Sequence, residues 1–262
     1  MKILCDTHSH TVASTHAYSN VHDYIRDAQK NQLQLISITD HAPSMPDAPH
    51  LWHFANMKVI PRVIENIAVL RGIEANILPE PFKHAEKANC YVDLSDFLDE
   101  KLDIAIASFH EPVFKPQDKK THTQAMIRAI ESGYVQIIGH PGNPNYPIDQ
   151  EEVIRAAKDN NVVFEINNSS FKASRKGSEP HCLELISLID KHDWKVCVGS
   201  DAHISLDVGL FERSIGALTQ QGFNENNIVN RTPKSLLGFL EQHGRPVVGE
   251  LQDWLQQLPS TE

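Results

Sequence analysis

The chain lacks several features that would define its class at once. No apolar stretch approaches the roughly 20 residues that a membrane-spanning helix needs. The first residues turn polar at Asp6, too soon for a secretory signal peptide, so we expect a cytoplasmic location and no membrane partner. No C-x-x-C pair is present, which argues against a thiolate zinc site or a redox pair. The four cysteines are Cys5, Cys90, Cys182 and Cys197.

Positive charge is also scarce. The 24 Lys and Arg residues face 34 Asp and Glu residues, and the formal net charge is -10. Proteins that bind nucleic acids rely on a basic surface, so the sequence disfavours nucleic acid as a partner. A small anionic substrate is not excluded, because bound metal ions can dominate the field of a site. The oligomeric state is left open, with a homo-oligomer as one alternative.

Short apolar runs organise the chain. Runs rich in Val and Ile, typical of buried parallel strands, occupy residues 3–5, 35–38, 69–73, 104–109, 137–138, 162–166 and 196–198. Segments with helical spacing or capping signals lie between and after them, at residues 21–31, 125–131, 153–159, 184–192, 206–220 and 232–243. The tail at 247–258 is expected to form an outer strap or a short helix. This alternation predicts a parallel α/β barrel, in a single domain over residues 1–262.

Histidine is the abundant functional residue, with 15 copies. Six of the seven apolar runs end at a residue that can bind a metal, and the sixth run ends at a weaker ligand, Asn167. A parallel barrel gathers the C-terminal ends of its strands in one mouth, so we expect these ends to meet. The strong ligands are His8, His10, His41, Glu74, His110, His140, Asp201 and His203.

The spacing of these ligands favours a multinuclear centre. His8 and His10 point to one side of an extended chain, and Asp201 and His203 repeat that spacing at the last run. Glu74 has two oxygens and can bridge two ions. The strand ends and the loops just beyond them offer seven His, one Glu and one Asp. Because a zinc ion takes about three or four protein ligands, this set suits three divalent ions. Zinc is the first expectation, with manganese or iron as alternatives.

Five motifs place these ligands in a recognisable order and resemble those of the polymerase and histidinol phosphatase (PHP) family. They are His8-Ser9-His10-Thr11, Thr39-Asp40-His41, Gly72-Ile73-Glu74, His140-Pro141 and Ser200-Asp201-Ala202-His203. The segments 11–19, 109–114, 165–171 and 174–178 are similar to the YcdX-type zinc phosphatases of this family.

The resemblance implies a distorted (β/α)7 TIM-like barrel, one strand short of a TIM barrel, with a trinuclear site. The implied ligands of the first ion are His8, His10, Glu74 and Asp201. Those of the second are Glu74, His110 and His140, and those of the third are His16, His41 and His203. His16 enters through the resemblance alone, because it lies in a loop.

The expected reaction is hydrolysis of a small phosphorylated metabolite, a phosphomonoester, by a metal-bridging hydroxide. We assign catalytic roles to Glu74, Asp201 and His203. Arg175 and Lys176 follow the sixth run and are expected to contact the phosphate group, the alternative being an exposed basic pair.

Four further residues are expected to support the ligands or to lie near the mouth of the barrel. Asp6 and Asp40 lie beside ligands and are expected to orient their imidazoles. His50 and His53 either line the mouth or pack within the 42–55 loop.

Three other functions remain as alternatives. An amidohydrolase-type enzyme also begins with His-x-His but commonly uses a bridging lysine carbamate, a role that Glu74 takes here. A phosphodiesterase or nuclease would need a basic groove, which the net charge of -10 does not favour. A metal-binding protein without catalysis is the third.

Overall fold

The structure is a computed structural model and describes residues 1–172 and 175–258. Ser174, at the start of the 174–178 segment, lies outside the described residues. Seven parallel strands follow one another in the order β1-β2-β4-β5-β6-β7-β8. Their bounds are β1 Cys5–Asp6, β2 Leu35–Ile38, β4 Ile67–Asn76, β5 Ile104–Ser108, β6 Ile137–Ile138, β7 Val163–Asn167 and β8 Val196–Gly199. A short strand, β3 (Val63–Ile64), pairs antiparallel with β4.

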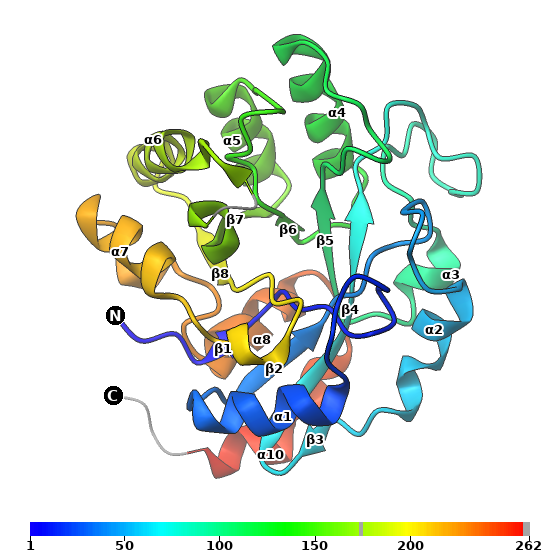
Figure 1. Cartoon of the computed structure of the whole chain (residues 1–262), viewed down its shortest axis with the longest axis vertical. Helices are drawn as coiled ribbons and strands as arrows, with labels where there is room; N and C mark the ends of the chain where they lie inside the picture. The colour runs from blue at the N-terminus through cyan, green and yellow to red at the C-terminus, as the bar shows by residue number, and fades with distance from the viewer. Residues whose placement is uncertain (173–174, 259–262) are drawn as a thin grey trace.

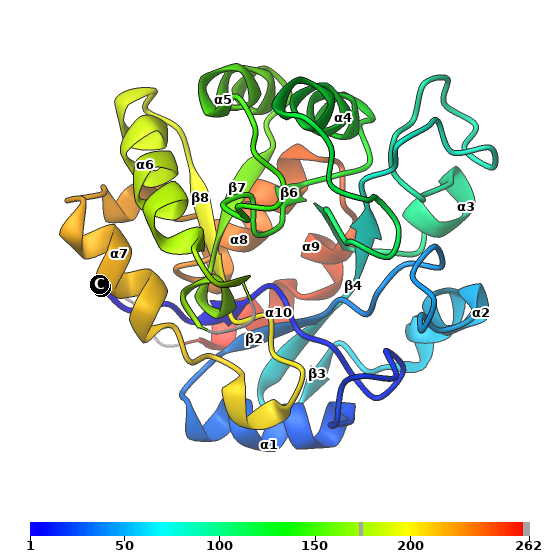
Figure 2. The ribbon, with the colours of Figure 1, turned by 45° about the horizontal axis from the view of Figure 1, so that its top comes forward.

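Helices surround these strands, as Figure 2 shows. The outer helices are α1 Val21–Lys30, α4 Lys119–Glu131, α5 Gln150–Asp159, α6 Ser178–Lys191 and α7 Glu212–Gln220. The short helices α2 (Leu51–Asn56) and α3 (Asp96–Asp99) lie within long segments that follow β2 and β4 (Figure 1). Single 3-10 turns occur at Met57–Val59, Asn168–Phe171, Ser205–Asp207 and Glu225–Asn227. The predicted (β/α)7 barrel is confirmed.

The barrel is nearly closed between its first and last strands. Ser9 and Ala202 form a parallel bridge beyond the ends of β1 and β8. Nearer the start of these strands, the buried side chain of Asn230 donates to the carbonyl oxygens of Cys5 and Val198, at 2.8 and 2.7 Å. Its amide oxygen accepts from the Val198 N–H at 2.9 Å. One side chain thus replaces part of the missing ladder of hydrogen bonds.

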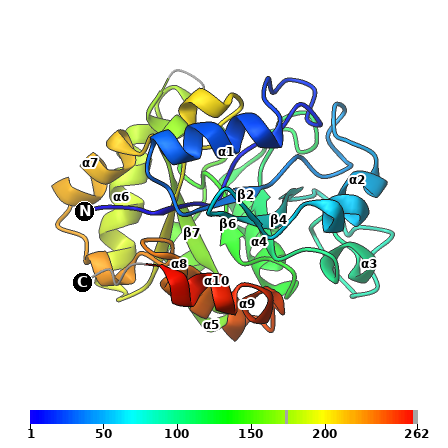
Figure 3. The ribbon, with the colours of Figure 1, turned by 90° about the horizontal axis from the view of Figure 1, so that it is seen from below.

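Two apolar cores hold the molecule together. The larger lies between the strands and the outer helices. The smaller fills the barrel where the strands begin, and combines strand residues such as Leu35, Ile104 and Val163 with α8 (Pro233–Gln242), α9 (Val247–Glu250) and α10 (Gln252–Gln257). Figure 3 shows these three helices together at that end of the molecule. The tail forms short helices, as one of the two expectations had it, but it closes the barrel, so its expected place on the outside was wrong: Val247 and Leu251 are fully buried.

Helix boundaries differ from the predicted ones where a cap or a glycine intervenes. The helix predicted at 125–131 begins earlier, at Lys119, because the Asp118 carboxylate caps it by accepting the Thr121 N–H at 2.8 Å. The helix predicted at 206–220 is divided into a 3-10 turn and α7. Gly209 separates the two with a left-handed backbone (φ 72°), and its N–H donates to Asp6 at 2.9 Å.

Candidate metal centre

The centre is built around Glu74, near the end of β4. Its side chain is 1% exposed, and its two oxygens face five imidazoles. Oε1 lies 3.0 Å from His140, 3.3 Å from His110 and 3.4 Å from His8, each measured to Nε2. Oε2 lies 3.0 Å from Nδ1 of His41 and 3.5 Å from Nε2 of His10. Residues from the ends of four other strands thus meet at one carboxylate, as parallel barrel geometry predicts.

Asp201 is the second carboxylate of the centre. Its Oδ1 lies 3.4 Å from His10 Nε2 and 3.6 Å from both His8 Nε2 and His203 Nδ1. Its Oδ2 accepts from Nη2 of Arg175 at 2.7 Å. The backbone of Asp201 is left-handed (φ 56°), a conformation that non-glycine residues rarely adopt and that clusters at functional sites.

His16 joins the centre from the loop after β1. Its Nε2 lies 2.9 Å from Nε2 of His203, and the Nε2 atoms of His8 and His10 are 3.1 Å apart. The structure therefore brings all nine predicted ligands into one cluster, including the one that strand-end spacing alone does not identify.

The chemistry of this cluster fits divalent metal ions. Three subsets hold potential ligand atoms within 4.8 Å of one another: His8, His10 and Asp201; His41, Glu74 and His110; and His10, His41 and His203. Nε2 of His41 and Nδ1 of His10 are buried with no hydrogen-bond partner among the described residues. Buried polar atoms are normally paired, so a cluster of imidazoles and carboxylates that leaves buried ring nitrogens unpaired fits a cation-binding space.

Electrostatics adapts several ligands to this role. Burial lowers the pKa of His10 to about 3, and the neighbouring His41 adds to the effect. Burial and Arg175 lower the pKa of His140 to about 4. Burial opposes ionisation of Glu74, yet His110 and His8 hold its pKa well below the usual range. The imidazoles of His10 and His140 therefore stay neutral and the Glu74 carboxylate stays ionised at pH 7, which are the forms that bind metals. For His8 and His41 burial also lowers the pKa, but the neighbouring carboxylates outweigh it and raise the pKa of both imidazoles, so that a metal would have to displace a proton there.

Three residues behind the ligands were not predicted. Glu165 accepts from Nδ1 of His8 at 2.7 Å, and Asn76 Oδ1 lies 2.7 Å from Nδ1 of His110. Asp47 contacts Nδ1 of His16. Period-two spacing was the available signal for two of them, because Asn76 follows Glu74 by two residues and Glu165 precedes Asn167 by two. Asp47 lies in a loop without such a pattern.

The expectation that Asp6 and Asp40 orient ligand imidazoles was wrong. Asp6 accepts backbone N–H groups, from Ser200 at 3.1 Å and Gly209 at 2.9 Å. Asp40 accepts from the Thr11 N–H and hydroxyl, both at 2.8 Å, and from the Ser14 hydroxyl at 2.8 Å. Both carboxylates fix the backbone that carries the ligands instead.

The two histidines of the 42–55 segment support its local structure. His50 caps α2 by accepting the Trp52 N–H at 3.2 Å. His53 Nε2 lies 3.1 Å from Asp40. The His50 contact lies within the segment, one of the two expected roles, whereas the His53 contact ties the segment to Asp40, two residues after β2.

The two basic residues predicted to bind phosphate differ in position. Arg175 reaches into the centre, where it donates to Asp201 at 2.7 Å and to Asn167 at 3.3 Å. Lys176 is exposed. Asn167, the residue that ends the sixth apolar run in place of a strong metal ligand, thus accepts a hydrogen bond from the Arg175 guanidinium at the edge of the cluster.

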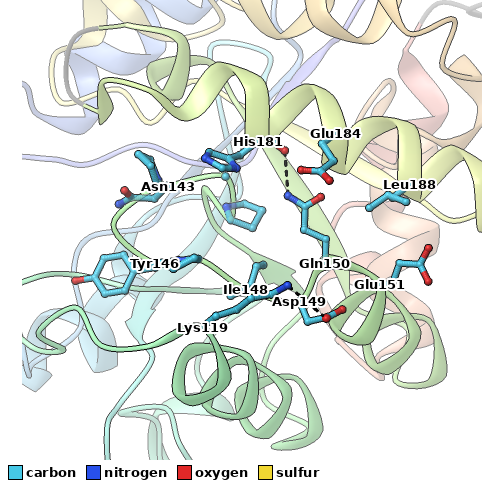
Figure 4. A pocket seen from close by; sticks show the side chains of 14 residues that line it. Lys119, Asn143, Tyr146, Ile148, Asp149, Gln150, Glu151, His181, Glu184 and Leu188 are labelled. Carbon is cyan, nitrogen blue, oxygen red and sulfur yellow. Dashed lines mark hydrogen bonds and ion pairs between the residues drawn. The ribbon is translucent and has the colours of Figure 1, made fainter.

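A cavity of about 430 Å³ lies beside the barrel mouth, between the loop after β6 and helices α4, α5 and α6 (Figure 4). Its lining includes Lys119, Asn143, Asp149 and His181, and none of the nine predicted ligands.

In the described part of the chain, no helix is both long and apolar enough to cross a bilayer.

Known proteins share the sequence and the fold of this chain. The PHP domain matches residues 6–170. A protein of Shewanella amazonensis (strain ATCC BAA-1098 / SB2B), named a probable phosphatase, is 50% identical over 96% of this chain and 97% of its own. A probable phosphatase of Shewanella sediminis (strain HAW-EB3) is 48% identical over 97% of this chain and 100% of its own.

Solved structures share the fold at low sequence identity. Histidinol phosphate phosphatase from Lactococcus lactis subsp. lactis Il1403, complexed with zinc, L-histidinol and phosphate, superposes with a TM-score of 0.56 at 17% identity. The match covers 84% of this chain and 94% of that one. The family domain spans more than half of the sequence, and the Shewanella relatives match almost all of it. The chain therefore belongs to the PHP domain family.

Proposed function

We propose that this protein is a metal-dependent phosphomonoesterase with three divalent ions, zinc first, and manganese or iron as alternatives. The observation that carries the proposal is the Glu74 carboxylate among five imidazoles, with Asp201 beside it. The substrate would be a small phosphorylated metabolite, and the location cytoplasmic. The probable phosphatases that share about half of the sequence support this reading.

The nine ligands would divide as the family resemblance implies. Glu74 would be shared by two ions, the first held with His8, His10 and Asp201 and the second with His110 and His140. His16, His41 and His203 would hold the third. When bound, the ions would supply a hydroxide nucleophile and offset charge on the phosphate group. The zinc and phosphate bound by the Lactococcus lactis phosphatase are consistent with this assignment.

The protein groups would position the reaction. Glu74, Asp201 and His203 would hold the ions in place around the reacting phosphate, and the two carboxylates would partly offset the positive charge of the ions. Arg175 would bind a phosphate oxygen. Its hydrogen bond to the Asp201 carboxylate, 2.7 Å long, holds the positively charged guanidinium at the edge of the cluster. Lys176, exposed beside it, would add positive charge at the entrance. A covalent nucleophile is not required.

A metal analysis and an assay test the proposal together. The purified protein is expected to contain about three ions, to hydrolyse p-nitrophenyl phosphate, and to lose that activity with a chelator until metal is returned. Bis-p-nitrophenyl phosphate separates the phosphodiesterase alternative, and a dipeptide amide separates an amidohydrolase. A metal-replete protein that hydrolyses no phosphomonoester would contradict the proposal.

Two variants test the assigned roles. Glu74→Gln is expected to lose metal content and rate together, because it removes the shared charge. Arg175→Ala is expected to lower kcat/KM by about 10- to 100-fold, since a hydrogen bond to a charged group contributes about 1.5–3 kcal/mol. Lys176→Ala should have a smaller effect. Unchanged metal content and rate in Glu74→Gln would contradict the bridging role.

A further inference from the structure

The proposed third ion site differs from the other two in its exposure. The side chains of His16 and His203 are 46% and 30% exposed. Those of His8 and His10 are fully buried, and Glu74 is 1% exposed. The third site therefore lies at the solvent side of the centre, and the first lies at its floor.

Asp47 stands behind the exposed ligand. Its carboxylate contacts Nδ1 of His16, and the opposite ring nitrogen, Nε2, lies 2.9 Å from His203. Asp47 comes from the segment between β2 and α2, and its carbonyl accepts the Thr15 N–H at 3.3 Å. The loop after β1, which carries His16, and the segment between β2 and α2, which carries Asp47, thus contact each other at His16.

The same arrangement occurs at the floor of the centre with many more restraints. Glu165 is fully buried and lies 2.7 Å from Nδ1 of His8. Its second oxygen accepts the His140 N–H and the Asn167 amide, each at 2.9 Å. One carboxylate therefore fixes ligands of two sites from a regular strand, β7, whereas Asp47 fixes one ligand from a loop.

Two physical consequences follow from this contrast. A carboxylate behind an imidazole selects the tautomer and the orientation that bind metal, and its removal commonly weakens metal affinity by about 10- to 100-fold. Exposed loops also open at a lower free-energy cost than buried strands. A site whose outer ligand and its support both come from loops should release its ion first.

We propose that Asp47 is the positioning residue of the third site, and that this site binds its ion more weakly than the other two and exchanges it with solvent. The inference rests on the proposed trinuclear function. Activity would then follow the free metal concentration in a range where the first two sites are already filled.

Graded metal removal tests the inference. Zinc-loaded protein is equilibrated with zinc buffers of decreasing free concentration, and the zinc retained per chain is measured after rapid desalting. The wild-type chain is expected to lose one ion in a first step and the other two in a later one. Asp47→Asn and Asp47→Ala should move only the first step, by about 10- to 100-fold in free zinc.

Matched controls identify the site. Glu241→Gln, which removes an exposed carboxylate on α8 at the other end of the barrel, should release zinc as the wild type does. His16→Ala should lack the first step altogether. Far-ultraviolet circular dichroism and the melting temperature of each metal-loaded variant check that the fold is retained, and Asp47→Ala provides a second variant if one is unstable.

The outcomes distinguish a failure of this inference from a failure of the proposed trinuclear phosphatase function. A wild-type chain that never holds three ions contradicts the proposed ion count. A chain with three ions that leave in one step contradicts the weak third site. A first step that is the same in wild type and both Asp47 variants contradicts the positioning role, while the phosphatase proposal stands.

Discussion

At the scale of single residues, two glycines near the ends of strands make room for neighbouring side chains, and one of them adjoins the support of a metal ligand. A Cβ atom added at Gly199 would lie 2.0 Å from Glu165 Oε1 and 3.1 Å from the Cβ of His8. A Cβ at Gly139 would lie 2.2 Å from the Ser108 hydroxyl oxygen. Gly199 is the last residue of β8, and Gly139 immediately follows β6. At Gly199 a side chain would collide with the support of His8, so the site requires a glycine there.

Gly199→Ala should consequently disturb the site and the fold. The added methyl group must displace Glu165 or His8, and overpacking of this kind costs about 1–3 kcal/mol. We expect a lower free energy of unfolding in urea and weaker zinc binding. Gly216→Ala is the control, because a Cβ there meets nothing within 4 Å on a helix, where alanine is favoured. Equal stability of both variants would contradict the steric argument.

Residue spacing predicted the ligands better than their supports. His8, Glu74 and Asp201 lie at strand ends, where topology alone brings distant residues together. The support of His8, Glu165, is 157 residues away, and only the packed barrel makes that pair visible. His16 and Asp47 lie in loops without a repeating pattern, so His16 was found through resemblance and Asp47 was missed.

At the scale of elements, the seven parallel strands were predictable because each is a short Val- and Ile-rich run between helical segments. The short elements β3, α2 and α3 were not predicted, since two to six residues carry too little periodicity. The role of α8–α10 also escaped prediction. An amphipathic segment looks the same whether it covers the outside of a barrel or closes one end of it.

The junction between β1 and β8 depends on Asn230. Asn230→Ala would leave the Val198 N–H and two carbonyl oxygens without these partners in a buried place. Each unsatisfied buried group costs about 1–3 kcal/mol, so we expect a loss of at least about 2 kcal/mol in the free energy of unfolding. Zinc binding should weaken too, because both strands lead into ligands. Asn226→Ala, at an exposed turn, provides the comparison.

The link between α1 and the 205–207 turn should depend on pH. Arg26, then Lys30 and Ser205, lower the pKa of Asp27 below its usual value, although burial opposes them. The Ser205 hydroxyl donates to Asp27 at 2.6 Å. A folded-state pKa below the unfolded one of about 3.9 means that the stabilisation is complete above that pH, declines below it, and is lost as pH falls through the lower folded-state pKa.

Asp27→Asn should therefore lower the melting temperature at pH 7, and the difference from wild type should shrink below about pH 4. Ser205→Ala should remove part of the same stabilisation. Thermal unfolding of the three proteins between pH 3 and 7 measures this. A difference that stays constant across that range would show that the charge of Asp27 is not the cause.

At the scale of the whole molecule, the fold and the metal centre occupy separate regions. The larger core lies between strands and outer helices, and the smaller core fills the closed end with α8–α10. The ligands gather at the opposite, open end. Neither core includes a ligand, so burial of apolar surface, the main stabilising contribution, does not depend on metal.

Metal removal should thus lower stability without unfolding the chain. Ligands that bind only the folded state stabilise it by RT ln(1 + [L]/Kd), about 2.7 kcal/mol for one site at 100 times its Kd. We expect the chelated protein to keep its far-ultraviolet circular dichroism spectrum at 25 °C while its melting temperature falls, and added zinc to restore it. Glu74→Gln, which should bind less zinc, is expected to respond less to the chelator. A chelated chain that loses its helical signal would mean that the metals complete the fold, and that the two apolar cores are insufficient without them.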